Sequence, residues 1–354
     1  MRLKALDWRG CVRRIRNGIA YPFWALQLLT GAKSFLDNPL IGSPALNERG
    51  LHVARQALAH RAASYRRRSL ERFVPPELVA AFERDGFVLV RDVLPPDEFA
   101  RLVEEVRRYR GPARETTQGD TITRRLALDP AALTAMPSVR RFLDLSLWRR
   151  LLRLVGSQDA EPICYLQTIL LQAVPGDPDP QTALHADTFH PTVKAWFALT
   201  DVAEDGGPFT YVPGSHRITP GREAWEKRMS LVASRGADRL TGRGSFRVRE
   251  EDLADMGYPP PRALAVPANS LIVADTGGFH ARGPSAGPGM RVEIWAYGRR
   301  NPFFTLPFDL WRIQALGLRR ATLAWAAGDW LERRGLKPQV WRQRPGVSAF
   351  DPAE

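Results

Sequence analysis

The feature that most constrains this chain is the tripeptide His185-Ala186-Asp187, followed far along the sequence by His280 and Arg291. On a β-strand, residues two positions apart project from the same face, so His185 and Asp187 can point at one metal ion while Ala186 points away. A distant histidine then completes a set of two imidazoles and one carboxylate on one side of the ion. This facial set suits non-haem iron(II), because it leaves the opposite coordination positions open. The pattern therefore predicts a rigid sheet that gathers distant strand ends around a reactive metal.

The sequence around the metal residues has the pattern of strands separated by turns. Residues 165–174 form a strand-length apolar run that ends at the proline-rich loop 175–180. Residues 193–202 predict a second strand, and residues 269–275 predict a third that runs toward His280. Metal ligands at strand ends are held by the sheet behind them, so this placement favours a functional site over a chance motif.

Arg291 is expected on a strand that follows the last metal residue. Turn-forming residues fill positions 281–289, so the chain should fold back there, and Arg291 then shares one strand face with Glu293. A buried guanidinium requires an anionic partner, and its planar fork matches a carboxylate in a two-point contact. The sequence leaves two partners open, a carboxylate ligand in a cavity and the neighbouring Glu293. Arg124 and Arg125 are the next candidates for such a clamp.

Five segments of the chain resemble the phytanoyl-CoA dioxygenase family. The segments are residues 85–94, residues 185–187, residues 196–202, residues 207–216 with their Pro-Gly-Ser-His turn, and His280 with Arg291. The likeness covers about residues 75–305, and both the order and the spacing of the segments agree. It implies a double-stranded β-helix, or jelly roll, that uses iron(II), O₂ and 2-oxoglutarate.

The resemblance also implies roles for single residues. The implied iron ligands are His185, Asp187 and His280. Arg291 is implied as the partner of the distal carboxylate of 2-oxoglutarate, with Trp196 and Ile169 as neighbours of that cosubstrate. Gln167, on the same predicted strand as Ile169, is a further candidate for cosubstrate binding.

Two positions depart from the family pattern. Arg282 stands two positions after the last histidine, where a small hydroxyl residue or glycine is common in the family. Glu293 stands two positions after the arginine, where related enzymes often carry serine. Because these changes alter the surroundings of the cosubstrate, Arg282 and Glu293 are candidates for contact with the substrate.

Other metal and catalytic assignments are weaker. His190 is an alternative ligand close to Asp187, but its odd spacing from His185 places it on the other face of a continuing strand. Related halogenases carry a small residue where this chain has Asp187, so halogenation is disfavoured. The sequence contains no Ser-His-Asp arrangement, phosphate-binding glycine loop or Cys-x-x-Cys pair that would support a rival chemistry.

The positive charge of the chain does not by itself indicate binding to nucleic acid. The net charge is +13, and all but five of the 51 basic residues are arginines, but no nucleic-acid-binding motif accompanies them. Six of the ten tryptophans lie outside the family resemblance, namely Trp8, Trp24, Trp311, Trp325, Trp330 and Trp341. Tryptophan beside arginine suits a lipid headgroup region, so peripheral contact with anionic membranes through residues 1–36 and 308–345 is one interpretation. The other is that both ends pack on the core.

Length and composition predict one catalytic domain with helical additions. We expect a basic helical extension at 1–74, a jelly-roll domain at 75–305 with an insertion at about 221–261, and arginine- and tryptophan-rich helices at 306–354. The fold class is mainly β with flanking helices and a jelly-roll, cupin-like core. Because the chain has only two cysteines, a disulfide framework is excluded. This fits a cytoplasmic location, and a location peripheral to the membrane is the alternative.

These expectations together describe an iron(II)- and 2-oxoglutarate-dependent oxygenase. The expected reaction is hydroxylation of an unactivated C–H bond in a small-molecule or lipid-like substrate, with release of succinate and CO₂. The alternative is a jelly-roll binding or scaffold protein that keeps the ligand residues without turnover. The sequence leaves the substrate and the oligomeric state open.

Overall fold

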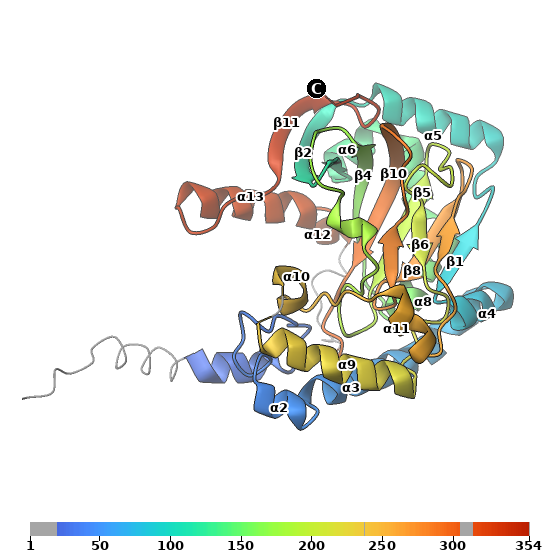
Figure 1. The fold of residues 1–354 in the computed structure, drawn as a ribbon. Helices are drawn as coiled ribbons and strands as arrows, with labels where there is room; N and C mark the ends of the chain where they lie inside the picture. The colour runs from blue at the N-terminus through green and yellow to red at the C-terminus, as the bar shows by residue number, and fades with distance from the viewer. Residues whose placement is uncertain (1–19, 237, 305–313, 354) are drawn as a thin grey trace, which may run out of the picture.

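Two antiparallel sheets face each other in the centre of the molecule (Figure 1). The computed structural model describes residues 20–236, 238–304 and 314–353. The larger sheet has the order β1-β8-β5-β10-β4-β3-β2-β11, and the smaller has the order β7-β6-β9. This arrangement confirms the expected class, a mainly β jelly-roll core with flanking helices.

The strands of the larger sheet, in that order, are Phe87–Val90, Leu271–Asp275, Val193–Ala198, Gly289–Gly298, Ile163–Leu171, Thr121–Ala127, Gly111–Gln118 and Arg342–Val347. Those of the smaller sheet are Arg262–Leu264, Phe209–Tyr211 and His280–Arg282. Every strand pairs with its neighbours in antiparallel fashion. The strands expected around 165–174, 193–202, 269–275 and 291–297 are therefore all present.

Strand β10 shows how the sequence divides the two faces of the larger sheet. Val292, Ile294 and Ala296 are fully buried in the main apolar core. The alternate residues, among them Arg291 and Trp295, face the space between the two sheets and line a cavity there. The polar face expected from the alternation of this strand is thus the face that carries the site.

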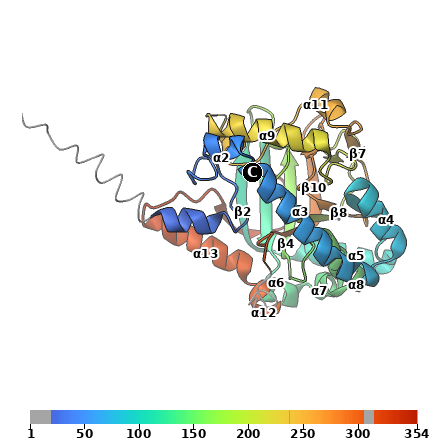
Figure 2. The ribbon, with the colours of Figure 1, turned by 90° about the horizontal axis from the view of Figure 1, so that it is seen from below.

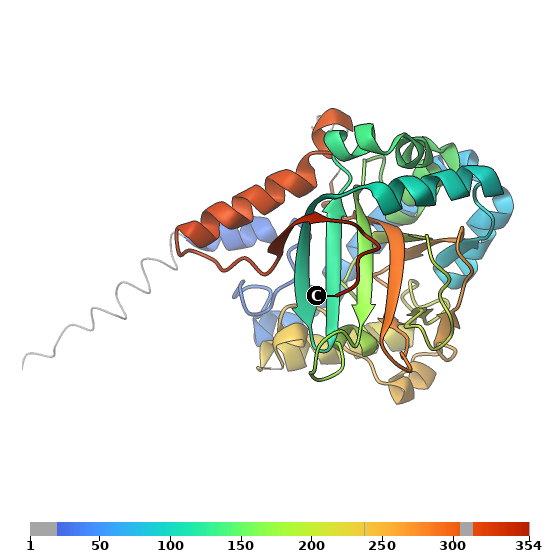
Figure 3. The same ribbon diagram turned by 90° about the horizontal axis from the view of Figure 1, so that it is seen from above.

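Helices cover the outer face of the larger sheet and one end of the core (Figures 1 and 3). The helices that contribute to the main apolar core are α4 (Pro76–Asp85), α5 (Pro96–Arg108), α6 (Pro130–Ala135), α7 (Pro137–Asp144) and α8 (Ser146–Gly156). Phe142 of α7 stacks on Phe197 of β5 with ring centroids 4.1 Å apart. The helices hold the sheet rigid from behind and leave its other face for the site.

Residues 20–74 of the N-terminal extension are part of the folded body. Its short helix α2 (Pro44–Glu48) and long helix α3 (Leu51–Leu70) pack against α9 (Pro220–Ser234), the main helix of the insertion, and the close approach is visible in Figure 2. His52 of α3 makes a buried contact at 2.8 Å with Glu226 of α9. This face of α3 thus packs on the insertion, where a buried carboxylate partners its polar side chain.

The insertion continues from α9 through two short helices, α10 (Arg239–Gly242) and α11 (Glu250–Asp255). It leads from the Pro-Gly-Ser-His turn to β7, as the order of the sequence required. Phe246 within it packs against Trp225 of α9 and contributes to a second apolar cluster beside the metal residues.

The C-terminal region differs from the helices expected at 306–354. It contains α12 (Gln314–Gly317), α13 (Arg320–Arg333) and then the strand β11, which pairs with β2 at the edge of the larger sheet. An exposed edge presents unpaired backbone groups, and β11 covers this one. Among the described helices, none combines the length and hydropathy that crossing a bilayer requires.

Candidate metal and cosubstrate site

The three predicted metal ligands meet at the end of the smaller sheet. The backbones of His185 and His280 pair with each other through two hydrogen bonds of 2.9 Å. The amide of Asp187 donates to the carbonyl of Thr276 at 2.9 Å, which holds the segment after His185 in place. The ligand atoms of the three side chains all lie within 4.8 Å of one another. Strand pairing thus brings the distant histidine to the tripeptide, as the spacing predicted.

Hydrogen bonds to the backbone orient both imidazoles. His185 Nδ1 lies 2.8 Å from the carbonyl oxygen of Ala183, and His280 Nδ1 lies 3.0 Å from that of Gly278. A carbonyl oxygen only accepts, so Nδ1 carries the proton in each ring and Nε2 keeps its lone pair. Each Nε2 is 3.8 Å from an oxygen of Asp187. Two neutral nitrogen donors and a carboxylate around one point fit a divalent metal.

Charge and burial keep the three ligands in the forms that bind metal. Burial lowers the pKa of His280 to about 4 and the pKa of His185 well below its usual value. Burial alone would raise the pKa of Asp187, but Lys194 and the two histidines more than offset this and hold the pKa well below the usual value. Lys194 Nζ lies 2.6 Å from Asp187 Oδ2.

Lys194 is a site residue that the sequence analysis missed. It stands on β5 opposite Tyr297 of β10, within the wall of the cavity. It is one of only five lysines in a chain that otherwise uses arginine, which is the signal that could have identified it. His190, the alternative ligand, is fully buried and lies outside the cluster of metal-binding atoms, with Nδ1 3.0 Å from the carbonyl oxygen of Pro191.

Arg291 lies in the same cavity as the metal residues. Its Nη1 donates to the carbonyl of Gly207, and its Nε forms an ion pair at 3.2 Å with Glu293, although Nε lacks a well-aligned hydrogen bond. None of the described residues accepts a hydrogen bond from its Nη2. Arg291 can therefore contact Glu293 and a carboxylate ligand at the same time. Glu293 pairs with one side of the guanidinium, and the other side faces the cavity.

A row of hydrogen-bonded polar groups crosses three strands beside Arg291. Gln167 of β4 donates from its amide to Glu293 Oε1 at 2.6 Å and accepts from Arg125 Nε of β3 at 2.7 Å. Because Glu293 also pairs with Arg291, both of its oxygens are engaged. Glu293 is not among the residues that line the cavity, so its position supports Arg291 and Gln167 rather than a substrate directly.

The cavity between the sheets has a volume of about 410 Å³ and is open on one side. The sequence-predicted residues that line it are Gln167, Ile169, His185, Asp187, Trp196, His280, Arg282 and Arg291. Arg282 is held there by an ion pair of 2.6 Å with the buried Asp179. Trp196 packs against Phe209 of the smaller sheet, with ring centroids 4.3 Å apart and ring planes tilted by 31°, and both side chains line the cavity.

On one side of the cavity, the sequence had indicated only Arg125, as a further candidate for the carboxylate clamp. Arg125 lines it from β3, and Trp341, which precedes β11, covers Arg125 with a ring centroid 4.7 Å from the guanidinium carbon. Arg124, the other arginine considered as a clamp, points to the opposite face, where it pairs with Glu115 at 2.7 Å. Arg124 is therefore excluded from the site, whereas Arg125 belongs to it.

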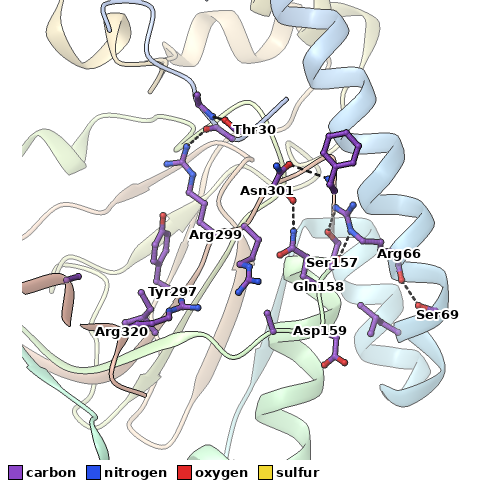
Figure 4. Close-up of a pocket in the computed structure, with 18 of the residues that line it drawn as sticks. Thr30, Arg66, Ser69, Ser157, Gln158, Asp159, Tyr297, Arg299, Asn301 and Arg320 are labelled. Atoms are coloured by element: carbon purple, nitrogen blue, oxygen red, sulfur yellow. Dashed lines mark hydrogen bonds between the residues drawn. The ribbon is translucent and has the colours of Figure 1, made fainter. Parts of the chain in front are cut away.

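A second and larger hollow of about 1160 Å³ lies beside the metal cavity and shares Ile163 and Tyr297 with it (Figure 4). Its arginines are tied to backbone and side-chain oxygens: Arg66 donates to the carbonyl of Ser157 at 2.8 Å, and Arg299 donates to that of Gly31 at 2.8 Å. Figure 4 shows Arg299 beside Tyr297, which lines both hollows. The second hollow thus adjoins the metal cavity at Ile163 and Tyr297.

Fold and site together define a jelly-roll protein with a candidate metal site. Residues 82–240 match the family model described as phytanoyl-CoA dioxygenase (PhyH). This stretch contains His185 and Asp187, and the structure adds His280 and Arg291 from beyond it. Residues 82–240 are therefore similar to the phytanoyl-CoA dioxygenase family, as the resemblance in the sequence indicated.

Individual proteins are more distant. A multifunctional dioxygenase, ausE of Emericella nidulans, is 28% identical over 174 residues, which cover 45% of this chain and 56% of that protein. The chain thus spans about half the length of the curated relatives it matches. The structure of the epimerase SnoN from nogalamycin biosynthesis overlaps 65% of this chain and 82% of its own, with 23% identity and a TM-score of 0.40. HygX of Streptomyces hygroscopicus, solved with nickel, 2-oxoglutarate and hygromycin B, overlaps 67% and 90%, with 17% identity and a TM-score of 0.39.

Proposed function

We propose that this protein is an iron(II)- and 2-oxoglutarate-dependent oxygenase that hydroxylates an unactivated C–H bond of a small-molecule or lipid-like substrate. The observation that carries the proposal is one cavity with a His-Asp-His cluster and a buried arginine whose Nη2 is without a hydrogen bond among the described residues. The family match and the dioxygenase relative support it. Bound iron would supply the activation of O₂, coupled to conversion of 2-oxoglutarate into succinate and CO₂.

His185, Asp187 and His280 would hold the metal through two Nε2 atoms and one carboxylate oxygen. The backbone carbonyls on Nδ1 fix the tautomer and the direction of each ring, so the ligands are already oriented before the metal binds. Lys194 contacts the other carboxylate oxygen of Asp187 and keeps the side chain ionised. Three protein ligands of this kind would leave coordination positions of the metal open for 2-oxoglutarate and O₂.

Arg291 would bind the distal carboxylate of 2-oxoglutarate. The ion pair with Glu293 and the hydrogen bond to the carbonyl of Gly207 fix the position of the guanidinium. Gln167 in turn donates a hydrogen bond to Glu293. Ile169 lies directly opposite Arg291 on β4, so it would flank the aliphatic part of the cosubstrate. Trp196, packed against Phe209, would exclude water from the metal side.

Turnover separates this proposal from a silent binding protein with the same residues. Under anaerobic conditions, iron(II) and 2-oxoglutarate together should produce a weak visible charge-transfer band that neither produces alone. Admission of air should then release succinate and remove the band. A band without any succinate would favour the silent alternative, and the absence of both would contradict the proposal. The His280→Ala variant is the control, since it should lose the band while the sheet behind it remains.

A further inference from the structure

We propose that Arg125 binds an anionic group of the substrate, a carboxylate or a phosphate, at the side of the cavity formed by β3 and the C-terminal segment. Only the identification of the bound anion as part of the substrate rests on the proposed function. The anion-binding site itself follows from the contacts of Arg125. It narrows the substrate class to compounds that carry such a group.

Arg125 is a cation without a charged partner. Among the described residues, no carboxylate lies within 4 Å of its guanidinium, and its only hydrogen bond runs from Nε to Gln167 Oε1 at 2.7 Å. The nearest carboxylate in this row, Glu293, already pairs with Arg291 and accepts from Gln167. Burial lowers the pKa of Arg125 to about 10, partly offset by Tyr165, Glu293 and Tyr297. A partly buried guanidinium of this kind is stabilised when an anion joins it.

Aromatic rings hold the guanidinium and leave its outer edge accessible. The guanidinium carbon lies 4.0 Å from the ring centroid of Trp295, 4.7 Å from that of Trp341 and 5.2 Å from that of Tyr165. Stacking against rings occupies the faces of the guanidinium plane. No described residue accepts a hydrogen bond from Nη1 or Nη2, and neither atom is among the buried polar atoms without a partner. These two nitrogens therefore present a planar fork to the cavity, the geometry that binds a carboxylate or phosphate in two places.

The charge of the cavity favours an anion beyond 2-oxoglutarate. Its lining carries four basic side chains, Arg125, Lys194, Arg282 and Arg291, against the single acidic side chain of Asp187. Lys194 is paired with Asp187 and Arg282 with the buried Asp179, and Arg291 is reserved for the cosubstrate in the proposed function. The charge of Arg125 is therefore left without a partner. The two positive charges of iron(II) would be balanced by the two carboxylates of 2-oxoglutarate, so a neutral substrate would leave the charge of Arg125 uncompensated.

The position of Arg125 separates it from the cosubstrate. In the strand register, Arg125 lies opposite Gln167, and Gln167 lies opposite Glu293. Arg125 is therefore two strands away from Arg291, which stands two residues before Glu293 on β10. With about 4.8 Å between strands and about 3.3 Å per residue, the two backbone positions are about 12 Å apart. The two guanidinium groups therefore form separate anion sites in one cavity.

Binding of small probes tests the proposal without knowledge of the substrate. The probes are benzoate and phenyl phosphate, which distinguish a carboxylate from a phosphate source, and benzamide as the neutral counterpart. Calorimetric titrations use the full chain under anaerobic conditions with iron(II) and saturating 2-oxoglutarate, which occupies Arg291. We expect at least one anionic probe to bind, benzamide to bind at least about tenfold more weakly, and Arg125→Gln to raise the dissociation constant of the anion at least about tenfold. Arg107→Gln is the matched control, because Arg107 also stacks on a ring, that of Phe350 at 4.0 Å, but lies outside the cavity.

The same titration on metal-free Arg291→Ala protein, without 2-oxoglutarate, keeps the inference apart from the proposed function. Binding of the anion that still depends on Arg125 supports the inference even if no iron or cosubstrate chemistry is found. The inference is overturned if neither anion binds, if benzamide binds as well as the anions, or if Arg125→Gln binds the anion as tightly as the wild type. Circular dichroism checks the fold of each variant, and Arg125→Met, which keeps an unbranched stem against the rings, must show the same loss if the Gln variant does not fold.

Discussion

The two sides of the metal cavity are built from different kinds of sequence. On the metal side, His185 and Asp187 are neighbours in a short motif, and one pair of backbone hydrogen bonds brings His280 to them. On the other side, Arg125 comes from a hairpin and Trp341 from the C-terminal segment, and β11 must pair with β2 before the two meet. The first side is defined by local spacing, whereas the second depends on the assembly of distant edges. We therefore expect the metal side to carry out the oxidation and the Arg125 side to determine which substrate binds.

The largest expected effect separates the metal side from everything else. His185→Ala, Asp187→Ala and His280→Ala each remove one of three protein ligands, so iron binding and succinate formation should fall to background. Thermal unfolding should remain cooperative in each variant, because the strands behind the ligands stay paired. Wild-type turnover in all three variants with iron present would show that the triad assignment is wrong.

The next effect compares the two arginines directly. Arg291→Ala should raise the concentration of 2-oxoglutarate needed for half-maximal succinate formation, since loss of one member of a buried charge pair costs about 2 to 5 kcal/mol. Arg125→Gln should leave that concentration unchanged. The comparison fails if both variants change the cosubstrate requirement equally, because the two guanidinium groups would then serve one anion.

A smaller effect tests whether the C-terminal segment belongs to the site. Trp341→Ala removes one ring from Arg125, and contacts of this kind contribute about 0.5 to 2 kcal/mol. Benzoate or phenyl phosphate should bind more weakly by that amount, with no change in the affinity for 2-oxoglutarate. Trp330→Ala is the control, because Trp330 is half exposed on α13 and does not line the cavity. Equal losses in the two variants would mean that the segment acts only through stability.

The smallest effect concerns the outer surface of both ends of the chain. Trp325 packs on Tyr165 and Trp341 on Arg125, so these two tryptophans face inward, while Trp8 and Trp311 lie outside the described residues. Exposed apolar side chains remain on residues 20–29 and along α13. Helix α13 begins and ends with an arginine, Arg320 and Arg333. We propose weak, reversible binding to anionic membranes through these surfaces, and expect it to disappear at high salt, where screening acts within about 3 Å at 1 M. Flotation with anionic and neutral vesicles measures it, and protein that stays unbound at low salt on anionic vesicles would contradict it.

The sequence predicted the parts of the fold in which one face is apolar. The strands around residues 165–174, 193–202 and 269–275 are buried in the sheet core, and their apolar runs identified them. On β10, the alternation of Arg291 and Glu293 with apolar neighbours placed the polar face correctly. The local sequence pattern is sufficient in these cases because each of these strands buries an apolar face along its whole length.

The hairpin of β2 and β3 could not be found in this way. Arg124 is buried on one face with Glu115, and Arg125 lies on the other face in the aromatic cage, so the apolar alternation of β3 is lost. Its partners come from residues far away in the sequence, and only the complete sheet reveals them. The turn at Gly119-Asp120 between β-prone threonines is the local signal that could have indicated the hairpin.

The most direct test of the account is the location of iron and 2-oxoglutarate in anaerobic crystals. Anomalous scattering at the iron edge should give one peak in contact with His185 Nε2, His280 Nε2 and the carboxylate of Asp187. The distal carboxylate of 2-oxoglutarate should lie on Arg291, and the nitrogens of Arg125 should remain free of it. An anomalous peak elsewhere, or 2-oxoglutarate bound across Arg125, would contradict the division of the cavity into a metal side and a substrate side.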